Sequence, residues 1–322
     1  MSVYRTCLPQ LEDRLFMADG GLETTLIFHD GIELPCFAAF DLLKDAAGIA
    51  RLERYFERYA ALARDEGVGA VLETPTWRAN PDWARRLGYD DAELEGVNRR
   101  AVDLLMRVRA RWETPATPIV ISGNLGPRGD GYRPDVRMSV EQARAYHQPQ
   151  LDTFAATLAD MAGAFTMNYV EEALGIAQAA RAAALPLAVS FTLETDGRLP
   201  SGDTLADAIA RTDDATGGYP VYYMINCAHP THFDTMLAEG GAWRERIRGV
   251  RANASRQSHA ELDEATELDD GDPAELGAQY RALRAWLARM NVVGGCCGTD
   301  HRHVAQICRA LKAVPPAGEA RA

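Results

Sequence analysis

The segment Gly-Gly-Cys-Cys-Gly at residues 294–298 and the distant pair Asn226-Cys227 carry the side chains with the most specific chemistry in this chain. Adjacent cysteines such as Cys296 and Cys297 rarely bond each other, because disulfide geometry requires well-separated Cα atoms. The flanking glycines let the backbone turn tightly, so both thiols could face one metal ion. Cys227 would add a third thiolate and leave the fourth zinc position open, as in catalytic zinc sites. The alternative is that the two cysteines pack as small apolar side chains.

The composition is that of an ordinary globular protein. The chain has 322 residues, of which 47% are hydrophobic and 25% charged, and this length fits one large α/β barrel or two average domains. The net charge of −12 argues against a nucleic-acid partner. Six cysteines in a chain this long do not form a disulfide framework. We find no signal peptide and no apolar run of membrane length, so we expect a cytoplasmic protein with reduced thiols and no membrane partner.

Apolar strand-like runs alternate with amphipathic helical patterns along the whole chain. The predicted strands are residues 14–18, 70–73, 118–123, 163–167, 185–192, 221–226, 247–251 and 291–294. The main predicted helices are residues 50–66, 92–112, 140–161, 170–184 and 273–290. This alternation favours a single closed (β/α)8 TIM-type barrel over residues 1–314, with a flexible tail at 315–322. A doubly wound open sheet is the second choice, since no G-x-G-x-x-G follows an early strand. The acidic segment 254–272 is predicted to be a long loop.

The polar residues of interest all follow predicted strands. They are Asp19, Glu73, Thr74, Asn124, Thr192, Glu194, Asn226, Cys227, Asn253, Cys296 and Cys297. In a TIM-type barrel, the carboxyl ends of the strands form one rim, and the active site lies there. Strands six and eight are close around an eight-stranded ring, so Cys227 can face Cys296 and Cys297. The predicted barrel therefore strengthens the prediction of a three-thiolate metal site.

The charge of such a site indicates a reaction class. Zinc with three thiolates has a net charge near −1 and is a weak Lewis acid, so it is poorly suited to activating water. It is well suited to binding a fourth thiolate that stays nucleophilic, because metal binding deprotonates a thiol near neutral pH. The site therefore predicts transfer of an electrophile to a substrate thiol, without a side-chain general base. A methyl sulfonium or quaternary ammonium donor would complement the negative charge.

These residues match a known family. The matching stretches, in the expected order, are 18–24, 73–80, 123–127, 190–192, 196–199, 226–227 and 294–299. The chain resembles the homocysteine S-methyltransferases, which include the betaine-dependent enzymes. The resemblance implies a zinc-dependent (β/α)8 barrel that methylates homocysteine to methionine. It also implies Cys227, Cys296 and Cys297 as zinc ligands and Asp19 as the contact for the amino group of homocysteine.

One position departs from the family pattern. Family members often carry a glutamate after strand four that helps to bind the substrate amine, and Phe165 stands at the corresponding position here. Either other groups, such as Glu23, Glu73 or Glu194, bind homocysteine in place of this glutamate, or the acceptor is a thiol other than homocysteine. The donor is left open among S-methylmethionine, S-adenosylmethionine, another sulfonium and a betaine. The absence of an adenosine-binding motif favours a small sulfonium.

The candidate substrate contacts are Asp19, Glu73, Thr74, Trp77, Thr192 and Asn226. Asp19 could instead complete a turn, and Glu73 could be a buried structural carboxylate paired with Arg78. Trp77 could form a cation-binding pocket through its ring or simply pack on the rim. Thr192 and Asn226 either orient ligands or satisfy backbone groups.

Four histidines follow the cysteine motifs. His229 and His232 offer an alternative Cys-x-His metal set, but we expect surface or capping roles for them. His301 and His303 follow Asp300, which is predicted to be the N-cap of the last helix, and either could support the zinc ligands from outside.

The leading hypothesis is a zinc-dependent thiol methyltransferase, with a homo-oligomer left open. The alternative is a non-catalytic zinc-binding or redox-sensing barrel that uses the vicinal cysteines. That alternative predicts a fourth protein ligand, His229 or His301. A zinc hydrolase is disfavoured, because hydrolase sites use histidine and carboxylate ligands.

Overall fold

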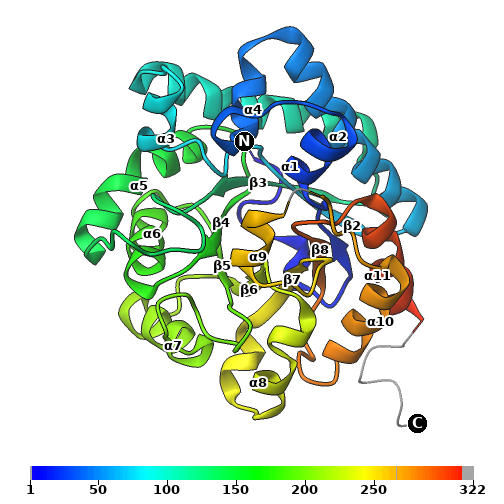
Figure 1. Ribbon diagram of the computed structural model, residues 1–322. Helices are drawn as coiled ribbons and strands as arrows, with labels where there is room; N and C mark the ends of the chain where they lie inside the picture. The colour runs from blue at the N-terminus through cyan, green and yellow to red at the C-terminus, as the bar shows by residue number, and fades with distance from the viewer. Residues whose placement is uncertain (1, 266, 314–322) are drawn as a thin grey trace.

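Eight parallel strands close into one barrel, as the computed structural model of residues 2–265 and 267–313 shows (Figure 1). The strands are β1 (Phe16–Met17), β2 (Gly69–Glu73), β3 (Ile119–Leu125), β4 (Met161–Met167), β5 (Leu187–Thr192), β6 (Tyr222–Asn226), β7 (Ile247–Ala252) and β8 (Val292–Gly295). They pair in chain order, and β1 closes the ring through the register Phe16 to Val292 and Met17 to Val293. The predicted TIM-type barrel is therefore confirmed.

The helices mostly surround the barrel on the outside, but the one at His259–Glu264 lies over the barrel opening (Figure 1). They are α1 (Leu22–Thr24), α2 (Ala46–Glu66), α3 (Pro81–Arg86), α4 (Asp91–Trp112), α5 (Val140–Ala155), α6 (Val170–Ala182), α7 (Leu205–Thr216), α8 (Asp234–Ala238), α9 (His259–Glu264), α10 (Pro273–Leu283) and α11 (His301–Lys312). Short 3₁₀ or π segments are η1 (Pro9–Leu11), η2 (Thr25–His29), η3 (Pro35–Phe37), η4 (Ala39–Lys44), η5 (Pro230–His232) and η6 (Ala242–Arg246). None of the described helices is long and apolar enough to cross a membrane.

Both faces of the strands are buried, which explains their nearly continuous apolar sequences. Side chains alternate in direction along a strand, so Val71 and Glu73 of β2 share one face. An inner cluster that includes Phe16, Val71 and Val292 fills the barrel, and a larger cluster packs between strands and helices. Glu73 follows Val71 on the inward face, one layer nearer the carboxyl rim.

Local sequence signals set several helix ends. Asp90 and Glu93 form a capping box at the start of α4, and Gly67 ends α2 in the left-handed conformation. Asp300 caps α11, as predicted, and its carboxylate accepts the Arg302 N–H at 2.8 Å.

Several predicted bounds differ from the observed elements; the helix predicted at 50–66, for example, begins at Ala46. The helix predicted at 140–161 ends at Ala155, because the hydroxyl of Thr157 bonds the Phe154 carbonyl and competes with the helical pattern. The helix predicted at 273–290 ends at Leu283. The predicted loop 254–272 contains α9, which begins with a Ser258–Glu261 capping box. The predicted tail 315–322 lies outside the described residues.

Candidate metal and substrate site

A cavity of about 90 Å³ lies at the carboxyl ends of the strands, and we call it the inner cavity. It brings together five of the six predicted substrate contacts and all three predicted metal ligands: Asp19, Glu73, Thr74, Trp77, Asn226, Cys227, Cys296 and Cys297. Thr192 is fully buried and does not line it. Most of the predicted rim residues therefore line one cavity, whereas Thr192, Glu194 and Asn253 do not.

The three cysteines converge at one side of the inner cavity. The Sγ atoms of Cys227, Cys296 and Cys297 all lie within 4.8 Å of one another. Zinc–sulfur bonds of about 2.3 Å in tetrahedral geometry place sulfur ligands about 3.8 Å apart, so the cluster fits one zinc ion. Among the described residues, no histidine or carboxylate joins this cluster. Three sulfur ligands would leave one of the four tetrahedral positions of a zinc ion open.

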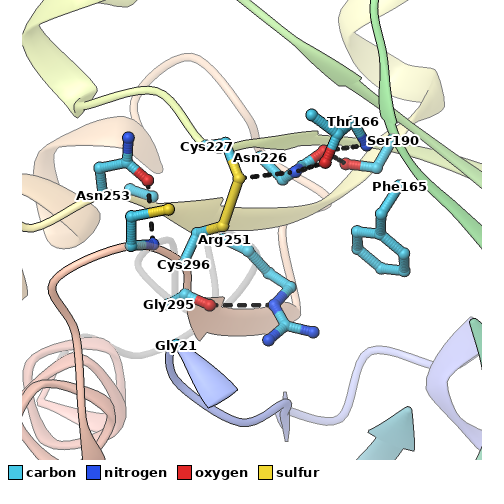
Figure 2. Close-up of a disulfide and its surroundings, with 12 residues drawn as sticks. Gly21, Phe165, Thr166, Ser190, Asn226, Cys227, Arg251, Asn253, Gly295 and Cys296 are labelled. Atoms are coloured by element: carbon cyan, nitrogen blue, oxygen red, sulfur yellow. Dashed lines mark hydrogen bonds between the residues drawn. A yellow bond between two sulfur atoms is a disulfide. The ribbon is translucent and has the colours of Figure 1, made fainter. Parts of the chain in front are cut away.

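The structure contains a disulfide that the sequence analysis did not predict. Cys227 and Cys296 are joined across a Cα–Cα distance of 5.4 Å, and Cys297 is not part of this bond (Figure 2). The expectation of fully reduced thiols is therefore wrong for this state of the chain. The pairing follows from the same convergence that suits a metal, because sulfur atoms close enough to share an ion are also close enough to bond. A three-thiolate metal site requires this bond to be reduced.

Asn226 holds the first of the cysteines in place. Its amide oxygen accepts the Thr166 N–H at 3.0 Å and the Ser190 hydroxyl at 2.6 Å (Figure 2). Its amide nitrogen donates to Thr166 Oγ1 at 2.9 Å and to Cys227 Sγ at 3.1 Å. Cys227 and Thr166 both have positive φ, which costs free energy for non-glycine residues. The amide side chain therefore fixes a strained turn and places an N–H donor on the sulfur.

The other two cysteines lie on a turn that β7 and β1 hold closely. The Cys296 N–H donates to the Ala252 carbonyl at 2.8 Å, and the Cys297 N–H donates to Asn253 Oδ1 at 3.1 Å (Figure 2). A Cβ atom on Gly21 would lie 2.6 Å from the Cys296 carbonyl oxygen, so only glycine fits there. This close approach explains why position 21, two residues after Asp19, is a glycine.

A buried arginine, which the sequence analysis missed, joins the two carboxylates of the inner cavity. Arg251 forms ion pairs with Asp19 and with Glu73, and its Nε–H donates to the Gly295 carbonyl at 3.0 Å (Figure 2). The proposed pairing of Glu73 with Arg78 is therefore wrong, although Glu73 is indeed buried. Tyr55 donates its hydroxyl to Asp19 at 3.0 Å. Arg251 is the next-to-last residue of β7, on the same rim as the predicted residues, and that position was its only sequence signal.

Two aromatic residues, Phe165 and Trp77, also line the inner cavity. Phe165, which stands at the family glutamate position, lines the cavity at 5% exposure. The Arg251 guanidinium lies 5.4 Å from the centre of its ring. Trp77 lines the same cavity, and its ring Nε1–H donates to the Phe165 carbonyl at 3.4 Å. Thr74 bonds Thr76 and the Asn124 N–H, so its hydroxyl links two strand ends.

Comparison with known proteins gives the family. A model of the homocysteine S-methyltransferase family matches residues 16–311, which run from β1 into α11. The chain belongs to the homocysteine S-methyltransferase family. The homocysteine S-methyltransferase of Escherichia coli K12 is 28% identical over 247 residues, covering 73% of this chain and 77% of that protein.

Solved structures agree on the fold of this family member. The oxidised form of the homocysteine methyltransferase MmuM from Escherichia coli is 24% identical, with a TM-score of 0.69 over 95% of this chain and 97% of that chain. The metallated form of the same protein is 22% identical, with a TM-score of 0.69 over 94% and 96% of the two chains.

The carboxylates of this homocysteine S-methyltransferase-family site have unusual acidities. Burial raises the pKa of Glu73 to about 8, with Asp19 adding to the effect and Arg251 opposing it. Burial raises the pKa of Glu23, which also lines the inner cavity, to about 7. Burial likewise raises the pKa of Asp19 against the opposing effect of Arg251. These directions reflect how little water reaches the inner cavity.

The predicted capping role is confirmed for His229, whose ring accepts the Thr231 N–H at the start of η5. His303, for which no capping role was predicted, completes the capping box of α11. His232 bonds the Arg256 carbonyl at 2.9 Å. None of these rings belongs to the cysteine cluster.

One further histidine contacts the site and was missed. His259, on α9, bonds the Cys227 carbonyl through Nε2 at 2.5 Å and the Glu194 carboxylate through Nδ1 at 3.2 Å. Its ring stacks on Tyr132 at 4.0 Å. The capping box at Ser258 could have predicted α9 from the sequence. No local sequence pattern predicts that His259 contacts Cys227.

Proposed function

We propose that this protein is a zinc-dependent homocysteine S-methyltransferase that forms methionine from homocysteine and a cationic methyl donor. The convergence of the three cysteine sulfurs in the wall of the inner cavity supports this proposal most strongly. The family match supports the reaction, and the absence of other ligand types in the described cluster supports an open fourth position.

Cys227, Cys296 and Cys297 would hold the zinc ion. When bound, zinc supplies a deprotonated acceptor thiol near neutral pH. The sulfur lone pair of the acceptor forms the new S–CH₃ bond in line with the bond that breaks. The electron pair of the broken bond stays on the departing heteroatom of the donor, which becomes neutral. The thiol proton goes to solvent, so no side-chain base is required.

The chain's own residues then bind and orient the acceptor. The carboxylates of Asp19 and Glu73 both pair with the guanidinium of Arg251. This group of charges is complementary to the ammonium and carboxylate groups of an amino acid. We propose that Asp19 contacts the acceptor ammonium. Phe165 and Trp77 exclude water from the reacting sulfur.

The rival function, a sensing or structural zinc site, is less well supported. It predicted a histidine as a fourth protein ligand, and the described cluster contains none.

We propose that the enzyme acts in the cytoplasm, because a reducing compartment keeps Cys227 and Cys296 available as thiolates.

X-ray absorption of the zinc protein tests the function. Reduced protein should bind one zinc ion per chain with three sulfur neighbours, and homocysteine should raise that number to four. Protein oxidised beforehand to the Cys227–Cys296 disulfide should bind almost no zinc until it is reduced again. Four protein ligands that homocysteine does not change would contradict the proposal.

The variant Asp19→Asn is expected to raise the KM for homocysteine about tenfold or more, with a smaller change in kcat. The physical reason is the loss of a charge-assisted hydrogen bond to the ammonium group, worth about 1.5–3 kcal/mol. Steady-state kinetics should be compared between homocysteine and 4-mercaptobutyrate, which lacks the amine. Only homocysteine should be affected. Asp41→Asn, at a buried aspartate outside the site, is the control. An unchanged KM would refute the role of Asp19.

A further inference from the structure

The wall of the inner cavity carries more acidic than basic side chains. Among the described residues of this wall, the charged ones are Asp19, Glu23, Glu73 and Arg251. Three carboxyl groups therefore share one guanidinium, and a zinc ion held by three thiolates would add further negative charge. A cavity of this charge attracts a cationic group and repels an anionic one. An acceptor thiol that carries an ammonium group is therefore favoured over one that carries only a carboxylate.

Two of the three carboxylates already have a cation as partner. Arg251 pairs with Asp19 Oδ1 and with Glu73, and its Nε–H donates to the Gly295 carbonyl at 3.0 Å. Tyr55 donates its hydroxyl to Asp19 Oδ2 at 3.0 Å. Each carboxylate oxygen of Asp19 therefore has a donor, although its remaining lone pair can still accept from an ammonium group. The charge of Asp19 and Glu73 is partly neutralised before any ligand binds.

Glu23 is the carboxylate without such a partner. It belongs to α1, directly after the Gly20-Gly21 turn, and is partly buried in the cavity wall. Among the described residues, no other side chain forms an ion pair or a hydrogen bond with its carboxylate. Burial raises the pKa of Glu23 to about 7, and the charge of Asp19 adds to this effect. A bound ammonium group would replace the hydration that the Glu23 carboxylate has lost.

The other glutamates that the sequence suggested for acceptor binding are less available. Glu73 pairs with Arg251, as described above. Glu194 bonds His259 Nδ1 at 3.2 Å and does not line the inner cavity. Of these three glutamates, only Glu23 combines a place in the cavity wall with a carboxylate that has no cation of its own.

We propose that Glu23 binds the ammonium group of the acceptor and thereby selects ammonium thiols as the acceptor class. The proposal rests on the proposed function and specifies its substrate. Asp19 contacts the same ammonium group, and Glu23 supplies the charge that Arg251 does not neutralise. Homocysteine belongs to this class, and so does 3-aminopropane-1-thiol, which is homocysteine without its carboxylate. 4-Mercaptobutyrate, which keeps the carboxylate and lacks the amine, is a poor ligand.

Calorimetric titration of the reduced, zinc-loaded protein with these three thiols, in the absence of a methyl donor, tests the assignment. We expect wild-type protein to bind both ammonium thiols about 100-fold more tightly than 4-mercaptobutyrate, because two charge-assisted hydrogen bonds are gained. Glu23→Gln should reduce this preference about tenfold or more. It should not weaken binding of 4-mercaptobutyrate, which shows that the variant is folded. Glu23→Asp, which keeps the charge, should retain part of the preference.

Glu53→Gln is the matched control, because Glu53 is also partly buried but lies on α2, outside the inner cavity. This variant should keep the wild-type preference. Equal binding of the three thiols to wild-type protein, or an unchanged preference in Glu23→Gln protein, would overturn the proposal.

Methyl transfer to homocysteine is measured separately on the same preparations. An ammonium preference that falls in Glu23→Gln protein, without any methyl transfer by wild-type protein, would leave the Glu23 assignment standing and refute the proposed function. Methyl transfer by wild-type protein together with an unchanged preference in Glu23→Gln protein would refute the Glu23 assignment alone.

Discussion

Cys296→Ser protein is expected to lose nearly all bound zinc and at least about 10³-fold in methyl transfer. Three sulfur ligands become two, and a serine hydroxyl does not replace a thiolate for zinc. The acceptor thiol, with an ordinary pKa near 8.5, would be mostly protonated at pH 7. Loss of alignment adds to the loss of deprotonation. Metal analysis and kcat/KM for homocysteine, both on reduced protein, measure the effect.

Cys7→Ser is the matched control for the cysteine experiment. Cys7 is exposed and lies outside the cysteine cluster, so its variant should keep full zinc content and activity. Full zinc binding and normal turnover in Cys296→Ser protein would refute the ligand assignment. Loss in both variants would indicate a general effect of thiol loss instead.

Arg251→Met is expected to lower the free energy of unfolding by about 3–5 kcal/mol, because it leaves Asp19 and Glu73 buried without their cation. Arg251→Met should also raise the KM for homocysteine, because Asp19 and Glu73 lose the guanidinium that pairs with them in the inner cavity. Urea unfolding and steady-state kinetics measure the two effects.

The double variant Arg251→Met, Glu73→Gln separates charge from packing. It should be more stable than Arg251→Met alone, because one unpaired buried carboxylate is removed. Arg248→Met, on the same strand, is the control, since no described carboxylate lies within ion-pair distance of Arg248. If Arg248→Met lowered the free energy of unfolding as much as Arg251→Met does, the ion pairs of Arg251 would contribute little to stability.

The sequence by itself determined the barrel and the position of the cysteines. Alternation of apolar runs and helices predicts parallel strands, and the carboxyl ends of parallel strands meet on one rim. Cys227 follows strand six, and Cys296 and Cys297 follow strand eight, so their convergence needed only strand order. These features depend on local pattern and on a general rule of barrel geometry.

Only the tertiary structure decided the charge pairing and the redox state of the site. Parallel strands are apolar on both faces, so the sequence does not reveal which side chains of β2 and β7 point inward. Arg251 meets Asp19 and Glu73 because closure of the ring places β7, β8, β1 and β2 side by side. The Cys227–Cys296 bond likewise depends on sulfur-to-sulfur distance, which spacing along the chain does not determine.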